Sequence, residues 1–177
     1  MKSSTVKNAI AIAFSAHEGQ YRKYGDKVPY IQHPLRVAFK VSRAMNGLII
    51  PVAAAVLHDV LEDTDTPPHV ISNACGDDVL WLVQELTNPS KLPEHRKKPR
   101  AERKRIDREH LKQVSHSAQI IKLCDRIDNL HDVSEGPADF RKLYAQESRL
   151  LLEVLSGANK ELEDELLAAI EEVEGSV

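Results

Sequence analysis

The stretch SAQIIKLCDRIDNLHDV, residues 117–133, decides the fold that we expect for this chain. Its apolar residues recur three and four positions apart, a spacing that places them on one face of an α-helix. These residues are Ile120, Leu123, Cys124, Ile127 and Leu130. Asp125, Asp128 and Asn129 share a polar face opposite this apolar stripe. The segment is therefore expected to form a helix with one side in the core.

The same helical spacing recurs on both sides of this stretch, whereas sustained alternation of apolar and polar residues is rare. The sequence therefore predicts an all-α fold. Helices are expected near residues 3–18, 34–45, 51–62, 67–74, 76–86, 100–113, 117–133, 138–156 and 159–174. Of the two long connections, residues 19–33 and 87–99, the second contains three prolines and is predicted to be a mobile loop. The length of 177 residues indicates a single domain, residues 1–177.

The composition is that of a soluble globular protein, with 42% hydrophobic residues and a formal net charge of -3. The longest segment without Asp, Glu, Lys or Arg, residues 44–58, is too short to cross a membrane. The first residues lack the layout of a signal peptide, so we expect a cytoplasmic protein with no membrane partner. Nucleic acid is not an expected partner, because domains that bind nucleic acid without sequence preference usually carry a net positive charge. The sequence makes no prediction of the oligomeric state.

Two local features add to this description. Between His95 and Arg108, eight residues are Lys or Arg. This basic segment either meets an anionic ligand or forms a solvated helix face. The two cysteines, Cys75 and Cys124, have no CxxC partner and are expected to be reduced, buried thiols.

Residue types that bind metal ions occur at His33, at the adjacent pair His58 and Asp59, and at Asp125. The apolar run at residues 53–57 leads directly into the pair, so burial of the run draws ionisable groups toward the interior. Such burial costs free energy unless a partner compensates, and a divalent cation would do so. Imidazole and carboxylate donors without cysteine suit Mn²⁺, Fe²⁺ or Zn²⁺.

Two further carboxylates, Glu62 and Asp63, follow the pair at helical spacing. Glu62 is four positions after His58, and Asp63 is four positions after Asp59, so each lies one turn beyond a candidate ligand on the same side. This places candidate general acids or bases beside a metal ion.

The order of these motifs resembles one known family. HP at residues 33–34, HDVLEDT at residues 58–64 and KLCDRIDNL at residues 122–130 look like the HD-domain metal-dependent phosphohydrolases. The chain is most similar to the hydrolase domain of the RelA/SpoT family, and to the stand-alone small alarmone hydrolases of the metazoan type, over nearly its whole length. The resemblance implies an HD-domain helical bundle.

The resemblance also implies an activity: Mn²⁺-dependent hydrolysis of the 3′-pyrophosphate of guanosine 3′,5′-bis(diphosphate), ppGpp, to GDP and pyrophosphate. Another divalent metal is an alternative to Mn²⁺. The implied metal ligands are His33, His58, Asp59 and Asp125, the residues that act on water are Glu62 and Asp63, and those that contact the nucleotide are Arg22, Lys23, Asn129 and Tyr144. Two alternatives stay open, since Arg22 also fits a surface charge and Tyr144 an aromatic at the edge of the core.

Two residues depart from the family pattern. Cys124 replaces a common Ala, a change that fits the same space. Asp128 stands where relatives more often carry His or Tyr, and its charge would repel a polyanionic substrate unless it is exposed or pairs with Arg126.

This departure leaves two other functions open. One is an HD-family phosphohydrolase that acts on another phosphorylated nucleotide such as NADPH. The other is a catalytically silent nucleotide sensor, which the intact set of four candidate ligands and two carboxylates disfavours.

Overall fold

The computed structural model describes residues 2–175, and this part of the chain contains helices and no strand. A single isolated antiparallel bridge joins Tyr21 to Pro29. The prediction of an all-α fold is confirmed. The elements are α1 (Lys2–Ala16), α2 (Gln32–Ala44), α3 (Ile49–Leu57), α4 (Val60–Asp63), α5 (Pro68–Cys75), α6 (Asp77–Leu86), the 3-10 helix η1 (Pro89–Lys91), α7 (Arg100–Leu111), α8 (His116–Val133), α9 (Ala138–Leu155) and α10 (Lys160–Gly175).

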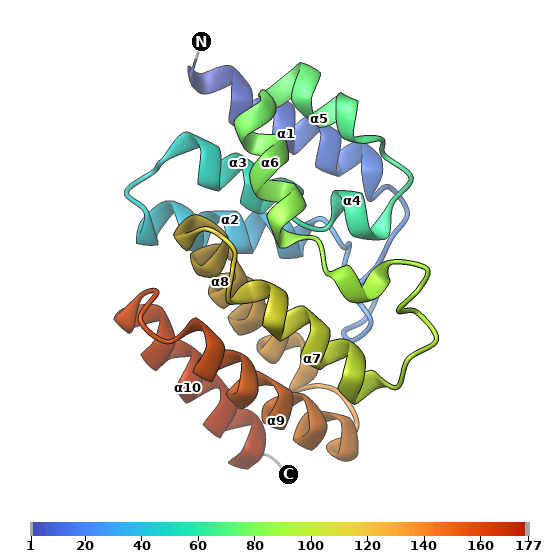
Figure 1. Ribbon diagram of the computed structural model, residues 1–177, viewed down its shortest axis with the longest axis vertical. Coiled ribbons are helices and arrows are strands. Elements are labelled where there is room, and N and C mark those ends of the chain that lie inside the picture. Colours follow the sequence, from blue (N-terminus) through green and yellow to red (C-terminus); the bar gives the residue numbers. More distant parts are fainter. Residues whose placement is uncertain (1, 176–177) are drawn as a thin grey trace.

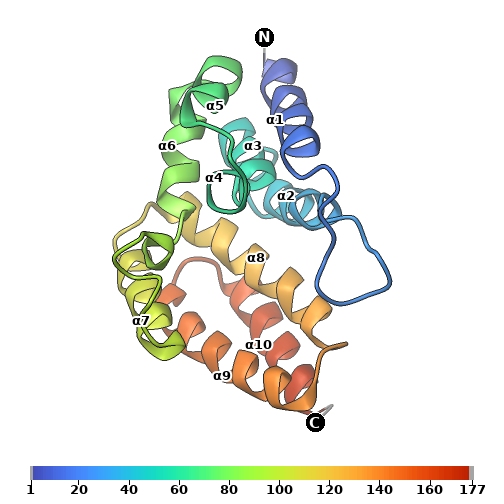
Figure 2. The same cartoon turned by 90° about the vertical axis from the view of Figure 1, so that its right-hand side faces the viewer.

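Helix α8 lies in the middle of the molecule. Figures 1 and 2 show α1 to α6 toward the end that carries the N-terminus, and α7, α9 and α10 toward the opposite end. Helix α8 crosses between these groups and packs against α2, α3 and α6 on one side and against α9 and α10 on the other. Polar side chains on α8 can therefore contact residues from both ends of the fold.

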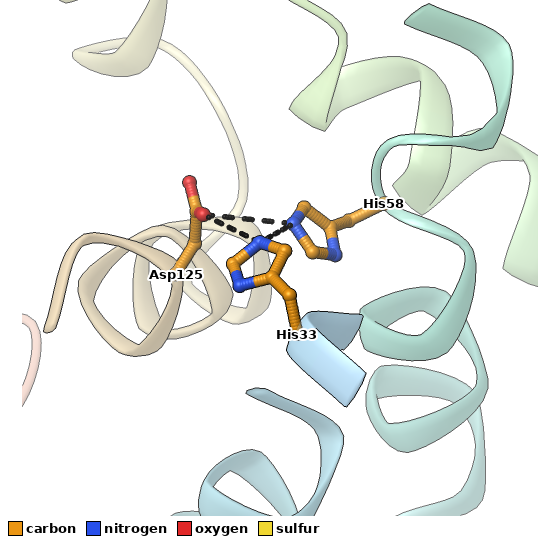
Figure 3. A group of neighbouring side chains, drawn as sticks. All are labelled: His33, His58 and Asp125. Carbon is orange, nitrogen blue, oxygen red and sulfur yellow. Dashed lines mark hydrogen bonds and ion pairs between the residues drawn. The ribbon is translucent and has the colours of Figure 1, made fainter. Parts of the chain in front are cut away.

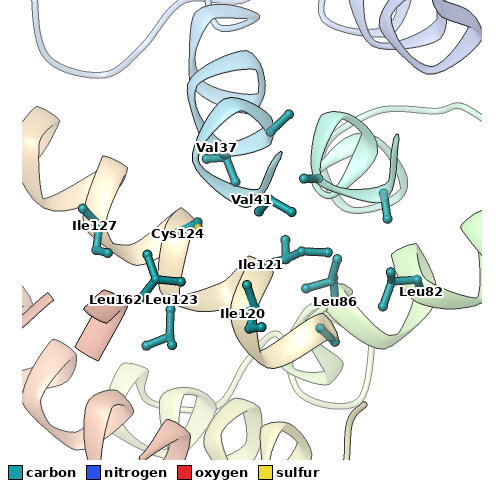
Figure 4. Close-up of a cluster of buried hydrophobic side chains, with 14 of the residues drawn as sticks. Val37, Val41, Leu82, Leu86, Ile120, Ile121, Leu123, Cys124, Ile127 and Leu162 are labelled. Atoms are coloured by element: carbon teal, nitrogen blue, oxygen red, sulfur yellow. The ribbon is translucent and has the colours of Figure 1, made fainter. Parts of the chain in front are cut away.

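Both apolar sides of α8 are buried. Ile120, Leu123 and Ile127 belong to the predicted apolar stripe, and each is at most 3% exposed. Ile121 lies outside that stripe and is also fully buried. Figure 4 shows Ile121 between α2 and α6, whereas Leu123 points toward α10. Ser115 begins the helix, because its hydroxyl oxygen accepts a hydrogen bond from the amide of Ala118 at 3.3 Å.

We expect Ile121→Ala to lower the free energy of unfolding by about 2 to 5 kcal/mol, because the truncation leaves a cavity between α8 and the helices at the N-terminal end. Urea unfolding followed by circular dichroism measures this change. The control is Leu143→Ala on α9, where the wild-type side chain is 40% exposed and the expected loss is below about 1 kcal/mol. Equal losses in the two variants would contradict the central role of α8.

The helix expected at residues 51–62 is a wrong prediction, because it is two helices with a turn at His58 and Asp59. The ring Nδ1 of His58 lies 2.8 Å from the carbonyl oxygen of Ala55, which in a continuous helix would accept the amide of Asp59. The carbonyl of Asp59 then accepts the amides of Glu62 and Asp63 and starts α4. This turn lets the adjacent side chains of His58 and Asp59 point toward one place.

The start of the segment at residues 87–99, predicted to be a mobile loop, contains a short helix that is hydrogen-bonded to α7. Residues 89–91 form η1, and the buried Ser90 donates from its amide and hydroxyl to the Asp107 carboxylate at 3.1 and 2.9 Å. Cys124 is buried as predicted, but Cys75 is only half-buried, and both are free thiols. None of the helices within residues 2–175 has the length and apolar character needed to cross a bilayer.

Candidate metal centre and active site

Four side chains from distant parts of the sequence converge between α2, the turn after α3, and α8. The Nε2 atoms of His33 and His58 lie 3.2 Å apart. Asp125 Oδ1 lies 3.3 Å from the first Nε2 and 3.6 Å from the second, as Figure 3 shows. Asp59 Oδ2 lies 3.5 and 3.1 Å from the same two atoms. The structure thus brings together all four residues that the sequence marked as candidate ligands.

The spacing of His33, His58 and Asp125 fits one cation, since one donor atom from each lies within 4.8 Å of the others, and Asp59 lies close to both imidazoles. Donors about 2.1 Å from a common ion lie roughly 3.0 to 3.4 Å apart at octahedral or tetrahedral angles. The distances between the imidazole and carboxylate donors, 3.1 to 3.6 Å, are close to this range. His33, His58 and Asp125 are also buried, so water compensates little for their charges. A divalent cation is the partner that this donor set suits.

Hydrogen bonds to Nδ1 direct both imidazoles toward the centre. The carbonyl of Ala55 and the carboxylate of Asp128 can only accept, so Nδ1 of His58 and Nδ1 of His33 must donate. Each Nε2 is left to face the cluster. Burial alone lowers the pKa of His33, but hydrogen bonds to Asp125, Asp128 and Asp59 raise it to about 9. Burial also lowers the pKa of His58, but the charges of Asp59 and Asp125 raise this pKa well above its usual value.

The two carboxylates of the cluster are held ionised. Burial alone would raise the pKa of Asp59, but the nearby imidazoles of His58 and His33 lower it well below the usual value. Burial acts likewise on Asp125, and the ammonium of Lys122 at 3.0 Å together with both imidazoles lowers its pKa. The Tyr30 hydroxyl donates to Asp59 Oδ2 at 2.6 Å. Both carboxylates are therefore ready to bind a cation.

Glu62 and Asp63 lie beside this cluster and share the cation Lys91. Lys91 Nζ lies 3.1 Å from Glu62 Oε1 and 3.1 Å from Asp63 Oδ1. Glu62 Oε2 also accepts from the backbone amide and the side-chain amide of Asn88 at 3.0 and 2.8 Å. The start of the 87–99 segment is thus fixed against the two carboxylates.

A cavity of about 180 Å³ opens beside the cluster. Its lining includes six carboxylates, among them those of Asp59, Asp125 and α4, and four cationic side chains, Lys104, Arg108, Lys122 and Arg126. Burial, together with the charge of Arg126, lowers the pKa of Lys104 to about 8 against the opposing charge of Asp107. Part of the basic segment therefore faces this cavity and is not only a solvated helix face. A cation site in the same cavity as these cationic side chains suits a phosphate that contacts both the cation and the side chains.

The four residues expected to contact a nucleotide differ in their burial and in their partners. The Arg22 side chain is only 9% exposed, forms an ion pair with Asp132 and donates to Asn129 Oδ1 at 2.7 Å, so it is not a surface charge. Asn129 in turn donates to Asp125 Oδ1 at 2.5 Å. Lys23 is exposed.

Lys23 and Tyr144 lie against aromatic or cationic partners. Lys23 Nζ is 5.1 Å from the ring centroid of Tyr24 and 4.7 Å from that of Phe140. Tyr144 lines the cavity at the edge of the core, with the guanidinium of Arg126 4.4 Å from its ring centroid. The ring thus lies at the edge of the core and also lines the cavity, and its contact with a nucleotide stays a prediction.

Asp128 does not have the partner that the sequence suggested. It is buried and accepts from Arg36 and His33, whereas Arg126 reaches Tyr144 and Ser148. Its charge is therefore neutralised inside the protein and does not face the cavity of the cluster.

Several residues around the site were missed in the sequence analysis. Arg36 lies three positions after His33, and Lys122 lies three positions before Asp125, so helical spacing from a candidate ligand could have identified both. Tyr30 stands three positions before His33, in the turn that leads into α2, where its carbonyl accepts the amide of His33 at 3.0 Å. Asn88 and Lys91 reach α4 only through the tertiary fold, and no local pattern marks them.

Comparisons with known proteins identify the family of this chain. The family model described as HD domain matches residues 9–161. The guanosine-3′,5′-bis(diphosphate) 3′-pyrophosphohydrolase MESH1 of Xenopus tropicalis is 36% identical, over 93% of this chain and 92% of the relative. The Homo sapiens protein of the same name is 33% identical over the same shares. A solved structure described as a metazoan ortholog of SpoT that hydrolyzes ppGpp superposes with a TM-score of 0.83 at 29% identity, covering 96% of this chain and 95% of that one.

Proposed function

The chain belongs to the HD domain family, and we propose from this that it is a metal-dependent guanosine-3′,5′-bis(diphosphate) 3′-pyrophosphohydrolase. The observation that carries the proposal is the convergence of two imidazoles and two carboxylates beside a cavity that four cationic side chains also line. The names of the relatives, which align over nearly their whole length, support this substrate. The products would be GDP and pyrophosphate.

We assign His33, His58, Asp59 and Asp125 as the ligands of the cation and Mn²⁺ as the native ion. The mixed nitrogen and oxygen donor set supports a borderline-to-hard divalent ion such as Mn²⁺, Fe²⁺ or Zn²⁺, and the family resemblance favours Mn²⁺ among them. When bound, a divalent cation supplies Lewis-acid chemistry, by lowering the pKa of water and by neutralising charge on phosphate.

Asp63 is assigned as the group that accepts a proton from the attacking water. Its Oδ1 contacts Lys91, and its Oδ2 has no hydrogen-bond partner among residues 2–175. Glu62 is only 9% exposed and uses both oxygens to hold Asn88 and Lys91, which supports a positioning role.

Water oxygen bonds to the phosphorus that carries the 3′ oxygen of the ribose, and the bond between that phosphorus and the 3′ oxygen breaks. Asp63 takes a proton from the water and returns it to the leaving 3′ oxygen.

The cationic side chains that line the cavity would bind the phosphates of the substrate. Arg126, 8% exposed, and Lys122, 7% exposed, are in place before any ligand arrives, so little side-chain ordering is needed. Asn129 and Tyr144 line the same cavity and are assigned to the nucleotide. Arg22 would act beside Asn129, and Lys23 would meet the distal phosphates.

Product analysis tests the proposal. Purified protein with Mn²⁺ is incubated with ppGpp, NADPH and GMP, and products are separated by ion-exchange chromatography. We expect GDP and pyrophosphate from ppGpp, and no reaction in excess chelator. Asp125→Ala protein, purified in the same way, reports any contaminating activity. A higher kcat/KM for NADPH or GMP than for ppGpp would replace the proposed substrate with another phosphorylated nucleotide.

Metal affinity is expected to rise with pH. In the metal-free protein, the pKa of about 9 at His33 means that the imidazole is protonated at pH 7, and a cation must displace this proton. The apparent affinity for Mn²⁺ should therefore increase about tenfold per pH unit between pH 6 and 8 for each proton displaced, and level off above about pH 9. The signal of free Mn²⁺ in electron paramagnetic resonance measures this. A constant affinity from pH 6 to 9 would contradict the protonation of His33.

A further inference from the structure

The two imidazoles of the metal centre are held by different kinds of group. Nδ1 of His58 donates to a backbone carbonyl, that of Ala55, within its own helical turn. Nδ1 of His33 donates to a side chain from another helix, Asp128 Oδ2, at 2.6 Å. The orientation of His33 therefore depends on a residue that a single substitution can remove.

Asp128 is itself fixed in a defined orientation. Arg36 donates from Nε to Oδ1 at 2.6 Å and from Nη2 to Oδ2 at 2.9 Å, a two-point contact that sets the plane of the carboxylate. The Arg36 side chain is 42% exposed, whereas that of Asp128 is 8% exposed. The guanidinium thus reaches in from the surface to a buried carboxylate, whose oxygen Oδ2 it shares with His33.

We propose that Asp128 is a positioning residue for His33, which keeps the proton on Nδ1 and turns Nε2 toward the metal, and that Arg36 orients Asp128 for this task. A carboxylate behind a metal-binding histidine fixes both the ring and the nitrogen that binds. Asp128 is not a ligand in this arrangement, because its Oδ2 contacts the ring nitrogen on the side away from the cluster. The inference rests on the metal site of the proposed function and not on its substrate.

The first test compares Mn²⁺ affinities of folded variants without nucleotide. Asp128→Ala should weaken Mn²⁺ binding about 10- to 100-fold. Asp128→Asn, which retains an oxygen for Nδ1, should lose less. The matched control is Glu165→Gln on α10, which removes a charge paired with Lys40 near the same face of α2 and should change affinity by less than twofold. Free Mn²⁺ is measured by electron paramagnetic resonance at a fixed pH.

Urea unfolding of the metal-free variants separates this role from a purely structural one. If Asp128 only joined α2 to α8, Asp128→Ala would be less stable but would bind Mn²⁺ within threefold of wild type. That outcome overturns the proposal. The positioning role instead requires a loss of affinity measured on protein that is folded before metal is added.

The second test does not depend on how any Asp128 variant folds. Nuclear magnetic resonance of ¹⁵N-labelled wild type with diamagnetic Zn²⁺ reports which nitrogen of His33 carries the proton, and His33→Gln assigns the signal. A proton on Nδ1 is expected, and a proton absent from Nδ1 overturns the proposal. Wild type that binds no Mn²⁺ overturns both the proposed function and this inference, whereas metal binding without hydrolysis of ppGpp overturns the substrate alone.

Discussion

Asp125→Ala should abolish Mn²⁺ binding and reduce turnover of ppGpp by roughly 10³-fold or more. The variant removes one of two carboxylates from the centre and leaves the ammonium of Lys122, which is 7% exposed, without its partner at 3.0 Å. A buried positive charge then repels a cation at the place where a negative charge had attracted it. Elemental analysis gives the metal content, and steady-state kinetics give kcat.

The control for this variant is Asp164→Ala on α10. The Asp164 side chain is 59% exposed and pairs with Lys160, far from the candidate ligands in the sequence, so metal content and rate should both stay at the wild-type level. Asp125→Ala protein that keeps both its metal and its rate would show that Asp125 is not a ligand.

Asp63→Asn should keep its metal and lose about 10² to 10⁴ in kcat. The substitution preserves the size of the side chain and an oxygen for Lys91, but it removes the basic carboxylate assigned to the attacking water. The measurements are metal content by elemental analysis and kcat at saturating Mn²⁺.

Asp63 is a cleaner choice for this experiment than Glu62. In Glu62→Gln, the new amide would face Lys91 or Asn88, which already donate to both oxygens of the wild-type side chain, so the 87–99 segment would also be disturbed. If the metal content of Asp63→Asn falls in parallel with its rate, Asp63 is a ligand or a structural residue, and its assignment to water is wrong.

The positions of the helices followed from the sequence because they depend on local spacing. The stripe from Ile120 to Leu130 predicted α8, and the structure begins α8 one residue earlier than expected. The break after Leu57 could not be predicted in this way, since the residues on both sides of it favour helix. The helix breaks there because the ring of His58 bonds to the carbonyl of Ala55 in place of a backbone amide. As a result, the side chains of His58 and Asp59 point toward the same place.

Within the site, residue types were predictable and their pairings were not. The residues that converge could be identified from their chemistry and their motifs. The effect of the Asp128 charge, in contrast, depends on which basic side chain pairs with it. The candidate on its own helix was Arg126, and the actual partner, Arg36, comes from α2. Pairings between helices depend on how the helices cross, which a local pattern does not encode.

The origin of the candidate ligands in distant segments has a consequence for heat denaturation. His33 and Asp125 are 92 positions apart, and α2, the turn after α3, and α8 all contribute donors. A cation that binds only the folded chain would stabilise the contacts between these segments. At 100 times its dissociation constant it would add about 2.7 kcal/mol to stability.

For a chain of this length, that gain corresponds to a rise of roughly 5 to 10 °C in Tm. Differential scanning fluorimetry with Mn²⁺ and with chelator measures the rise, which Asp125→Ala should lack. Equal Tm values in wild type with and without metal would contradict it. We therefore expect the resistance of this enzyme to heat to depend on the supply of its metal ion.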